Sequence, residues 1–430
     1  MYSIYLPEGV DLSFLPKSYL PAAQWFLHSI YTQRTCKKIG RAGWVRLHSK
    51  ILQRMMGDKY CDIKNALKVK DIVEDDGKPI RNVKSTAYRL TEGYRNTTHR
   101  RHDLTGKVIV KRLQKHKDDD RGLWCPVHHH LYHWLSRVSL PLVDKRYKRQ
   151  SLNITRIQDQ DFFLRVDKYG RVHTNVTNLK TSLRKLLLVN NSRLVELDIS
   201  NSQPLMFGML LKSKKQEEAT PYPTSPLCSG FLQNTDSNNT KSLNSLKELL
   251  PVWDRLRREA KRKQEGTTPY PTTPLCSGFL QNLTMTDDID GYVRFCEQGQ
   301  LYEAIMSYCD LPDHKRNKTK RRILSRVFYC RNREQDNDLS HAFGELFPTV
   351  LEAIKTLKRD DYRHLPRLMQ RVEADYIIHR VCGTLMRDYP HVPVLTIHDC
   401  IMTTPEHVPL VKTLMMSQAQ GIRPNIKIHY

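Results

Sequence analysis

"VLTIHDCIMTTPEH" (Val394–His407) places His398 and Asp399 side by side within an otherwise apolar, strand-like run. A simple turn would usually bring Gly, Pro or Asn with it, yet the first proline after the pair is Pro405. The pattern therefore predicts a β-hairpin whose tip presents a carboxylate. A rigid hairpin can hold that carboxylate against a metal ion, but one carboxylate binds Mg²⁺ poorly, so a second acid is expected elsewhere.

The second acid is predicted in "RLVELDISNSQPLMFGML" (Arg193–Leu210), where an apolar strand-like run ends on Asp198. Small polar residues follow, and then an apolar segment of helical character. An acid at such a junction can reach a metal together with the next backbone carbonyl. Asp198 and Asp399 together could bind two Mg²⁺ ions, with Mn²⁺ as an alternative. Such ions activate an attacking hydroxyl and stabilise a leaving pyrophosphate.

The charge of the chain indicates its partner. The 430 residues contain 70 Lys+Arg against 45 Asp+Glu, a formal net charge of +25. Such a balance favours nucleic acid, through neutralised phosphates and released counterions, over mere solubility or an acidic protein partner.

The remaining composition predicts a cytoplasmic protein. No apolar run of about 18 residues exists that could span a membrane. The beginning of the sequence lacks the basic and apolar regions of a secretory signal. The ten cysteines include no CxxC pair, which favours reduced thiols over a disulfide framework.

Residues 1–104 are predicted to form a winged-helix-like, nucleic-acid-binding module, with a plain structural lead-in domain as the alternative. Between 40 and 100, helix, turn and helix precede two strand-like runs around a turn at Asp76-Gly77. The apolar positions of this pattern are Val45, Ile51, Leu52, Met55, Ile63, Leu67 and Val69.

The next region is strongly polar and contains a group of metal-ligating residue types: Cys125, His128, His129, His130 and His133. A zinc site would need a second Cys or His pair at finger-like spacing, and none follows. Contacts of these histidines with phosphate or solvent are therefore favoured over zinc.

One repeat is present: "TPYPTSPLCSGFLQN" (Thr220–Asn234) returns with a single change as Thr268–Asn282. Solenoids need at least three copies. Two Pro-rich copies with a charged segment between them indicate a duplication within an insertion at about 212–285, typically exposed and loosely ordered, to which no chemistry is assigned.

The segments around Asp198 and Asp399 resemble conserved motifs of the family A DNA polymerases and the related single-subunit RNA polymerases. "LDISNSQP" is similar to their motif A and "TIHDCI" to their motif C. Three further segments match in the same order, namely "YGRVHTNVTNLKTSLRKLLL" (Tyr169–Leu188), "FGELFPTVLEAI" (Phe343–Ile354) and "LMQRVEADYIIHRV" (Leu368–Val381). The resemblance implies an α+β fold with a right-hand polymerase palm and fingers over 166–430. It leaves 105–165 as a short thumb-like or linker region.

A basic helix carrying motif B is then expected between Lys315 and Arg333, where nine Lys+Arg occur without an acid. A solvated face is the usual explanation of such a run. The resemblance implies instead that Arg316 and Lys320, four residues apart on one face, hold a triphosphate. Phe328 would stack near the nascent base pair. In the register shifted by one residue, Arg321 is the cation and Tyr329 the aromatic.

The resemblance also implies roles for other residues. Asp198 and Asp399 are the metal ligands and catalytic residues. His398 positions the primer terminus. Arg171 and Arg184 contact the nucleic acid, and Gln370 contacts the growing duplex in its minor groove.

Two departures from the family leave the choice of sugar open. Gln203 replaces the Glu that crowds the sugar 2′ position in the DNA polymerases, and Cys400 replaces an acid that many of them carry. No segment offers the acidic cluster of a proofreading exonuclease.

The expected function is therefore template-directed addition of nucleotides to a primer 3′ end, most simply by a DNA polymerase without proofreading. The expected partners are a nucleic acid template, a primer and nucleoside triphosphates. A primase or RNA polymerase on the same scaffold is one alternative, and a non-catalytic DNA-binding replication initiator is another. A compact polymerase with a DNA-binding front end also suggests a phage, plasmid or other mobile element, by association alone.

Overall fold

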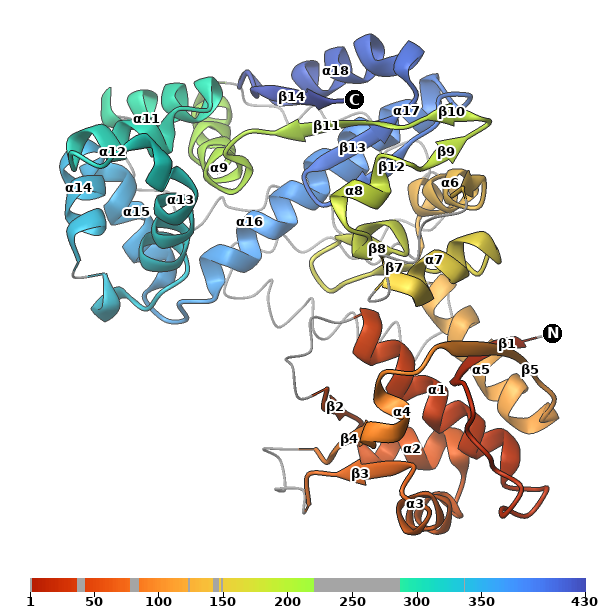
Figure 1. Cartoon of the computed structure of the whole chain (residues 1–430). Helices are drawn as coiled ribbons and strands as arrows, with labels where there is room; N and C mark the ends of the chain where they lie inside the picture. Colours follow the sequence, from red (N-terminus) through yellow and green to blue (C-terminus); the bar gives the residue numbers. More distant parts are fainter. Residues whose placement is uncertain are drawn as a thin grey trace, which may run out of the picture. The chain divides into compact units, whose positions relative to one another are not determined.

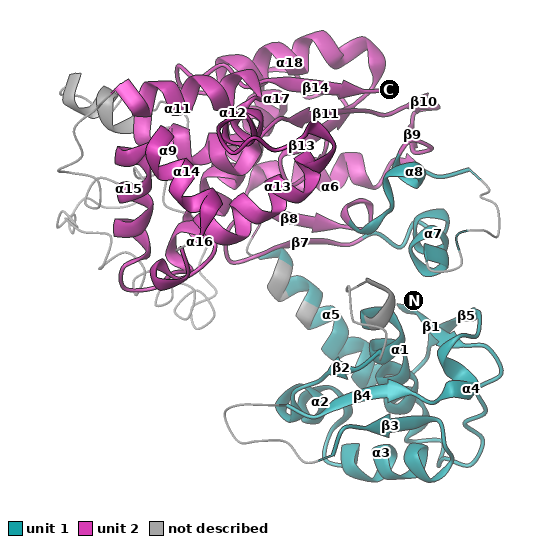
Figure 2. Cartoon of the chain, turned by 60° about the vertical axis from the view of Figure 1, so that its left-hand side comes forward, with its two compact units in different colours: residues 1–123, 139–162, 178–184 teal, residues 124–138, 163–177, 185–430 magenta. Residues whose placement is uncertain are grey.

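The computed structural model describes the following residues (Figure 1): 2–36, 43–77, 85–122, 124–141, 147, 150–219, 287–335 and 337–430. Its internal contacts divide the chain into two compact units (Figure 2). Unit 1 comprises Met1–Leu123, Ser139–Phe162 and Asn178–Arg184, and unit 2 comprises Trp124–Val138, Phe163–Thr177 and Lys185–Tyr430. Both Pro-rich repeats lie outside the described residues. None of the described helices is long and apolar enough to cross a membrane.

Unit 1 begins with β1 (Tyr2–Pro7), which pairs antiparallel with β5 (His99–Leu104). The long helix α1 (Leu20–Cys36) packs against β1. Its apolar side chains Phe26, Leu27 and Ile30 are fully buried and form the centre of this unit's core.

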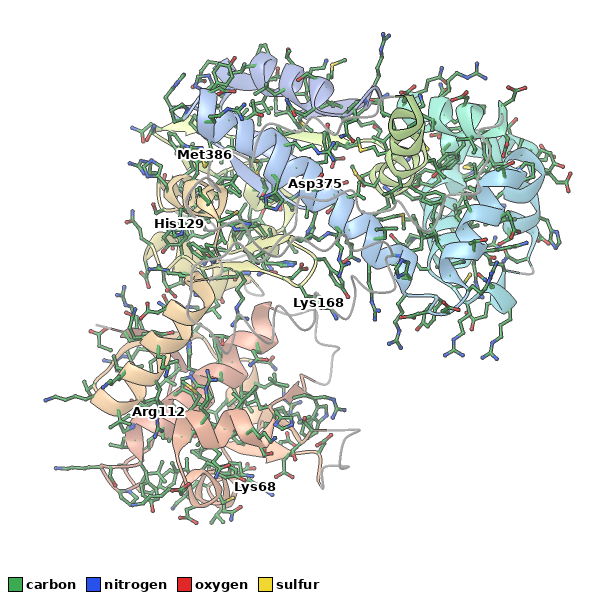
Figure 3. The ribbon with its side chains drawn as sticks, turned by 180° about the vertical axis from the view of Figure 1, so that it is seen from behind. Lys68, Arg112, His129, Lys168, Asp375 and Met386 are labelled. Carbon is green, nitrogen blue, oxygen red and sulfur yellow. The ribbon has the colours of Figure 1, made fainter. Side chains whose placement is uncertain are left out.

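Two short helices of unit 1 pack against α1. They are α2 (Ser49–Met56) and α3 (Tyr60–Val69). Gly57 ends α2 with a φ of 80°, a conformation that costs glycine little, and its N–H donates to the carbonyl of Gln53. The Lys68 side chain at the end of α3 forms an ion pair with Asp75 (Figure 3).

A three-stranded sheet in the order β2-β4-β3 completes this part, with β2 (Val45–Arg46), β3 (Val73–Asp75) and β4 (Ala87–Leu90). The predicted order of helix, helix and two strands is confirmed. Three details differ. Val45 lies in a strand, Ile51 and Val69 are exposed on their helices, and residues 76–86 separate β3 from β4 in place of a tight turn.

The region between 105 and 165 is divided between the two units. Helix α7 (Ser151–Gln158) belongs to unit 1, where Leu152 joins the core and the hydroxyl of Tyr5 donates to Asp159. The other helices of unit 1 are α4 (Glu92–Arg95), α5 (Lys107–Arg121) and α8 (Thr181–Arg184).

Helix α6 (Pro126–Leu135), by contrast, belongs to unit 2. His128 is fully buried at its first turn, and its Nδ1 accepts from the backbone N–H of Cys125 at 3.1 Å. Within the described residues, no group of three or more His, Cys, Asp or Glu side chains could hold a metal ion. His128 therefore has a capping role in this helix.

The centre of unit 2 is an antiparallel sheet in the order β12-β13-β11-β14. Its strands are β11 (Val195–Ile199), β12 (Leu395–Ile397), β13 (Cys400–Thr403) and β14 (Ile426–His429). The two predicted acid-bearing segments thus become neighbouring strands, because β11 pairs with β13.

Helices form the rest of unit 2. One group packs around the ring of Tyr292, with aromatic contacts that include Phe207, Phe343 and Phe347. This group consists of α9 (Ser202–Ala219), α11 (Asp287–Gln298), α12 (Leu301–Tyr308), α13 (Arg316–Ile323), the π-helical η5 (Leu324–Phe328), α14 (Asp338–Leu346) and α15 (Pro348–Lys358).

A second, longer helix runs from α16 (His364–Ala374) through the π-helical η7 (Asp375–Cys382) into α17 (Gly383–Asp388) (Figure 1). Figure 3 labels Asp375 and Met386 on it. α18 (Val408–Ser417) packs against η7 and β11.

The remaining elements are short. They are β6 (Val138–Ser139), β7 (Leu164–Val166), β8 (Val172–Thr174), β9 (Leu188–Val189), β10 (Ser192–Arg193) and the 3₁₀ turns η2 (Val176–Asn178), η4 (Asp313–Lys315), η6 (Asn332–Glu334) and η8 (Pro405–His407).

Candidate active site

The hairpin β12–β13 carries His398 and Asp399 at its tip, as predicted. Ile397 pairs with Cys400, so His398 and Asp399 between them form a two-residue turn. His398 adopts a φ of 55°. A two-residue hairpin turn needs a positive φ at its first central position, where Gly or Asn is usual. Backbone strain of this kind is concentrated at functional sites, because the surrounding structure has to maintain it.

Asp198 lies on the neighbouring strand, directly opposite Cys400. The Asp198 and Asp399 carboxylates are therefore neighbours, one on a strand and one on the adjoining hairpin tip. Burial raises the pKa of Asp198 to about 6, and repulsion by Asp399 adds to the shift. A cation bound between the two carboxylates would remove this repulsion.

The junction after Asp198 has the predicted form. Asn201 takes a φ of 53°, and its carbonyl accepts the N–H of Leu205 in the first turn of α9. Asparagine tolerates this left-handed conformation better than most residues. The helix α9 therefore begins four residues after Asp198, at Ser202, which places Gln203 in its first turn.

A chain of hydrogen bonds joins four polar side chains beside the carboxylate pair. An Nη2 proton of Arg171 is donated to Oε2 of Glu373 at 2.7 Å, and Nε2 of Gln203 donates to the same oxygen at 2.5 Å. The Tyr329 hydroxyl donates to Oε1 of Gln203 at 3.4 Å. Both ends of the Gln203 amide are thus engaged, which fixes its orientation.

Glu373 is the site residue that the sequence analysis did not identify. Its side chain is almost fully buried in α16, and burial raises its pKa to about 7, with Asp399 adding to the shift and Arg171 opposing it. Its second oxygen, Oε1, has no hydrogen-bond partner among the described residues. One signal was available, because Glu373 follows Met369 by four residues and so falls on the apolar face of its helix.

Two basic side chains oppose the raised pKa of Asp198, namely His429 and then Lys320, so Lys320 lies near enough to act on this carboxylate electrostatically. Arg316, one turn earlier, forms an ion pair with Glu303, and both cations lie over the ring of Tyr302. Arg321, the cation of the shifted register, is exposed and donates to the carbonyl of Asn317.

Phe328 and Tyr329 occupy different environments. The Phe328 ring is fully buried between Phe207 and Phe343, whereas the Tyr329 hydroxyl reaches Gln203. The π-helical η5 lies between Lys320 and these aromatics. A π-turn takes up one residue more than an α-turn. Lys320, whose charge acts on Asp198, and Tyr329, which reaches Gln203, are therefore nine residues apart, and each comes from a different one of the two predicted registers. Their roles in nucleotide binding stay predictions.

Four side chains bind the carbonyls that the π-turn leaves without helical partners. The Val327 carbonyl accepts from Gln335 at 2.8 Å and from the Lys358 ammonium at 2.6 Å. The Arg326 carbonyl accepts from the Ser340 hydroxyl at 3.2 Å and the Cys330 thiol at 2.9 Å. These contacts fix the turn that precedes Tyr329.

The remaining predicted site residues, His398, Gln370 and Arg184, do not belong to the hydrogen-bond chain described above. His398 has no partner for Nδ1 among the described residues, and burial, with Arg171 and His173, lowers its pKa, which keeps the imidazole neutral. Gln370 is half-buried on α16. Arg184 belongs to unit 1, where its guanidinium donates to the carbonyl of Leu179, and its contact with nucleic acid stays a prediction.

No protein-family model matches the chain, and no curated protein matches it significantly. One solved structure that is similar is the POL domain of Pol1 from M. smegmatis in complex with DNA primer-template and dNTP. The identity is 12% and the TM-score 0.29, over 75% of this chain and 53% of that chain. This chain thus spans about half the length of that one. At such a TM-score the similarity does not establish a common fold, so function has to be inferred from the site itself.

Proposed function

We propose that the protein is a template-directed nucleic acid polymerase that adds nucleotides to a primer 3′ end. The observation that supports this most is the pairing of β11 with the β12–β13 hairpin, which makes Asp198 and Asp399 neighbours under the charge of Lys320. Two carboxylates with a cation nearby suit the transfer of a nucleotidyl group from a nucleoside triphosphate to the primer 3′-hydroxyl, with pyrophosphate as the leaving group, because charge on the phosphate oxygens has to be stabilised.

The two carboxylates fit a site for Mg²⁺, with Mn²⁺ as a substitute. Mg²⁺ is commonly held by one or two protein carboxylates, with substrate phosphates and water completing its shell. Asp198 and Asp399 would hold two such ions, which when bound supply Lewis-acid stabilisation of phosphate charge. The raised pKa of Asp198 supports this, because its causes, burial first and then repulsion by Asp399, both disfavour an unpaired charge, and a bound cation would offset them.

The protein's own side chains would orient the substrates. Lys320 would neutralise the departing phosphates. Arg316, one turn earlier and paired with Glu303, would also contact the triphosphate. Tyr329 would pack against the incoming base pair. His398, neutral and with a free ring nitrogen among the described residues, would position the primer terminus by a hydrogen bond. Arg171, held by Glu373, and Gln370 on the same helix would contact the primer duplex.

A primase or RNA polymerase is the second candidate, favoured by one observation. According to the resemblance, Gln203 stands where the DNA polymerases have a glutamate that crowds the sugar 2′ position. Its amide still has one N–H beyond the bond to Glu373, which could donate to a 2′-hydroxyl. Such a bond is worth about 0.5–1.5 kcal/mol, so ribonucleotides should be discriminated against only weakly.

Unit 1 would act as a winged-helix-like nucleic-acid-binding module. Its α2, α3 and three-stranded sheet have the corresponding order, and its exposed cations include Arg46, Lys50, Arg54 and Lys59. This module also fits a non-catalytic replication initiator, which would bind nucleic acid without extending it.

The deciding experiment is extension of a labelled primer with Mg²⁺ across DNA or RNA templates and deoxy- or ribonucleotides. Extension with deoxynucleotides supports a DNA polymerase, and comparable extension with ribonucleotides supports the second candidate. Binding without extension in all four combinations would contradict the proposal and favour the initiator.

Asp198→Asn and Asp399→Asn should each abolish extension while leaving nucleic-acid affinity nearly unchanged. Affinity comes mainly from the basic surface, whereas the carboxylates act on transition-state charge. Asp388→Asn, at an exposed carboxylate elsewhere in unit 2, is the matched control and should extend normally. Near-normal extension by either site variant would refute the assignment.

A further inference from the structure

A row of cations runs along and beside helix α13. Lys318 and Arg322, four residues apart, share one face of this helix, Lys315 precedes them at the end of η4, and Arg326 follows in η5. All four are exposed. Lys320 lies two residues from both Lys318 and Arg322, which places it on the opposite face, toward Asp198.

None of the four cations of this row forms an ion pair within the part of the chain that the structure describes, although Asp338 and Glu345 share the cavity wall with Arg322. There, the ion pair made by α13 is that of Arg316 with Glu303, on the other face. Neighbouring like charges on a helix destabilise it by a few tenths of a kcal/mol per pair, so a polyanion bound along the row would relieve that cost.

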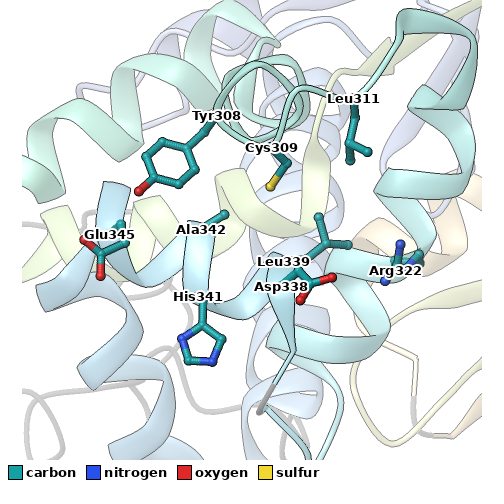
Figure 4. A pocket seen from close by; sticks show the side chains of 9 residues that line it. All are labelled: Tyr308, Cys309, Leu311, Arg322, Asp338, Leu339, His341, Ala342 and Glu345. Carbon is teal, nitrogen blue, oxygen red and sulfur yellow. The ribbon is translucent and has the colours of Figure 1, made fainter.

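A cavity of about 390 Å³ lies beside this row (Figure 4). Its lining is formed by Tyr308, Cys309, Leu311, Arg322, Asp338, Leu339, His341, Ala342 and Glu345. Arg322 belongs both to the row and to the cavity wall. Tyr308, at the end of α12, is 54% exposed and also lines this cavity, so its ring is accessible beside the cation row.

We infer that this surface binds an unpaired nucleic acid strand, with phosphates along Lys315, Lys318, Arg322 and Arg326 and a base stacked on Tyr308. Proteins that bind single strands combine a basic track for the backbone with aromatic rings for the bases. An unpaired strand fits better than a duplex, because only an unpaired base offers its face to the Tyr308 ring.

The two carboxylates in the cavity, Asp338 and Glu345, define what can enter it. They would repel a phosphate group or an acidic side chain, so the anionic backbone has to stay on the row outside. A neutral base can enter, since carboxylates accept hydrogen bonds from its amino groups. The same repulsion disfavours an acidic peptide as the occupant.

This surface goes beyond the proposed chemistry, because it concerns binding on the face of α13 that is turned away from the carboxylate pair. In the proposed polymerase, the strand held there would be template that has not yet been copied. Binding can be measured without nucleotides and in the Asp198→Asn background, so the result does not depend on whether extension occurs.

The test compares the affinity of the full chain for a blunt DNA duplex and for the same duplex with a single-stranded template overhang, by fluorescence anisotropy at fixed salt. Tyr308→Ala should weaken binding of the overhang substrate about fivefold or more, since stacking is worth roughly 1–3 kcal/mol per base. Binding of the blunt duplex should not change. Tyr308→Phe, which keeps the ring, should bind like the wild type.

Arg322→Ala should act in the same direction and should also reduce the salt dependence of overhang binding. Arg423→Ala and Tyr430→Ala are the matched controls, because they remove an exposed cation and an exposed ring elsewhere in unit 2. Thermal unfolding of each variant checks its fold. Equal losses for blunt and overhang substrates, or none in well-folded Tyr308→Ala and Arg322→Ala, would overturn the inference.

Discussion

At the scale of single residues, Glu373 joins Arg171 and Gln203 in the candidate site. One of its oxygens accepts hydrogen bonds from Arg171 and from Gln203, and Asp399 contributes to its raised pKa. With a pKa of about 7, it is only partly ionised at neutral pH. The orientation of Gln203 therefore depends on a carboxyl group that a further negative charge nearby would shift toward its protonated form, because it would raise the pKa of Glu373 again.

Gln203→Glu should make activity sensitive to alkaline pH. Two carboxyl groups at hydrogen-bond distance cannot both ionise cheaply, so they share a proton until the pH exceeds their raised pKa. We expect kcat/KM of this variant, relative to wild type, to fall about tenfold between pH 6.5 and 9, which corresponds to about 1.4 kcal/mol.

The exchanged pair Gln203→Glu/Glu373→Gln is the control for that variant. It keeps one carboxyl and one amide in contact, so the pH profile should return to that of the wild type. The melting temperature should follow the same pattern, which provides a readout independent of activity. A pH-independent ratio for the single variant would contradict the contact.

Asp198→Asn should stabilise the protein at neutral pH. The folded-state pKa of Asp198, about 6, lies above its ordinary value of 3.8. Between these values the folded chain holds more protons than the unfolded chain, so the contribution of Asp198 to the free energy of unfolding falls as pH rises. The asparagine of the variant does not ionise, so its free energy of unfolding does not include this decrease.

We expect a gain of about 1–2 kcal/mol at pH 7, reduced from the full shift because the carboxylate is partly exposed, and almost none at pH 4. Thermal unfolding at the two pH values measures it. Added Mg²⁺ should raise the melting temperature of the wild type more than that of the variant. A variant less stable than the wild type at pH 7 would show that burial and repulsion of the Asp198 charge do not outweigh its favourable contacts.

Local pattern explains which site residues could be predicted. Asp198 and Asp399 each follow a short apolar run, so their strand and hairpin settings are visible within a few residues of sequence. Glu373 depends on Arg171 and Gln203, which are far away along the chain, and no local pattern reveals a contact of that kind. Its position on an apolar helix face is the sole local trace.

At the scale of elements, the π-turn η5 determines which aromatic side chain reaches the site. Helical periodicity assumes a constant number of residues per turn, and η5 breaks that constancy between Lys320 and Tyr329. The sequence therefore predicted both registers without deciding between them. What maintains the π-turn is a set of side chains from later elements, among them the buried Lys358.

Lys358→Met should raise the KM for nucleotides severalfold with a smaller effect on kcat. Loss of the ammonium leaves the Val327 carbonyl with Gln335 as its partner, which loosens the turn that positions Tyr329. A hydrogen bond to a charged group is worth about 1.5–3 kcal/mol, although removing a buried charge recovers part of it. Steady-state kinetics with a primed template measure the split.

Lys355→Met, on the same helix, is the control for this change. Lys355 makes no side-chain contact with the π-turn among the hydrogen bonds of the described residues, so its KM should stay near that of the wild type. A Lys358→Met protein that unfolds far below the wild-type temperature would assign Lys358 to stability alone. An unchanged KM in a folded protein would also contradict the positioning role.

At the scale of the whole molecule, the two units interleave along the sequence. The element pattern of residues 1–104 and the resemblance over 166–430 predicted boundaries after 104 and 165, whereas the compact units exchange segments at 123, 138, 162, 177 and 184. Polarity alone cannot show this, because α6 and α7 arise from the same polar region and pack into different units.

A fragment of residues 1–104 should be much less stable than a fragment of residues 1–162. The shorter one lacks α5 and α7, so it loses Leu152 from its core and leaves Tyr5 without Asp159. Loss of a buried leucine alone costs about 2–5 kcal/mol. Circular dichroism melts of the two fragments measure the difference.

Leu152→Ala in the full chain is the matched variant and should lower the melting temperature of unit 1. Equal melting temperatures for the two fragments would show that residues 1–104 fold independently, as the sequence analysis predicted.

The π-turn η5 also has a consequence for chain length. Removing one exposed residue from it, such as Ser325, would place the tyrosine eight positions after Lys320 instead of nine, a spacing that keeps both on the same side of an ordinary α-helix. Related sequences could therefore differ by a one-residue gap inside this helix and still present the same side chains. An alignment that forbids gaps within helices would match the wrong aromatic residue here.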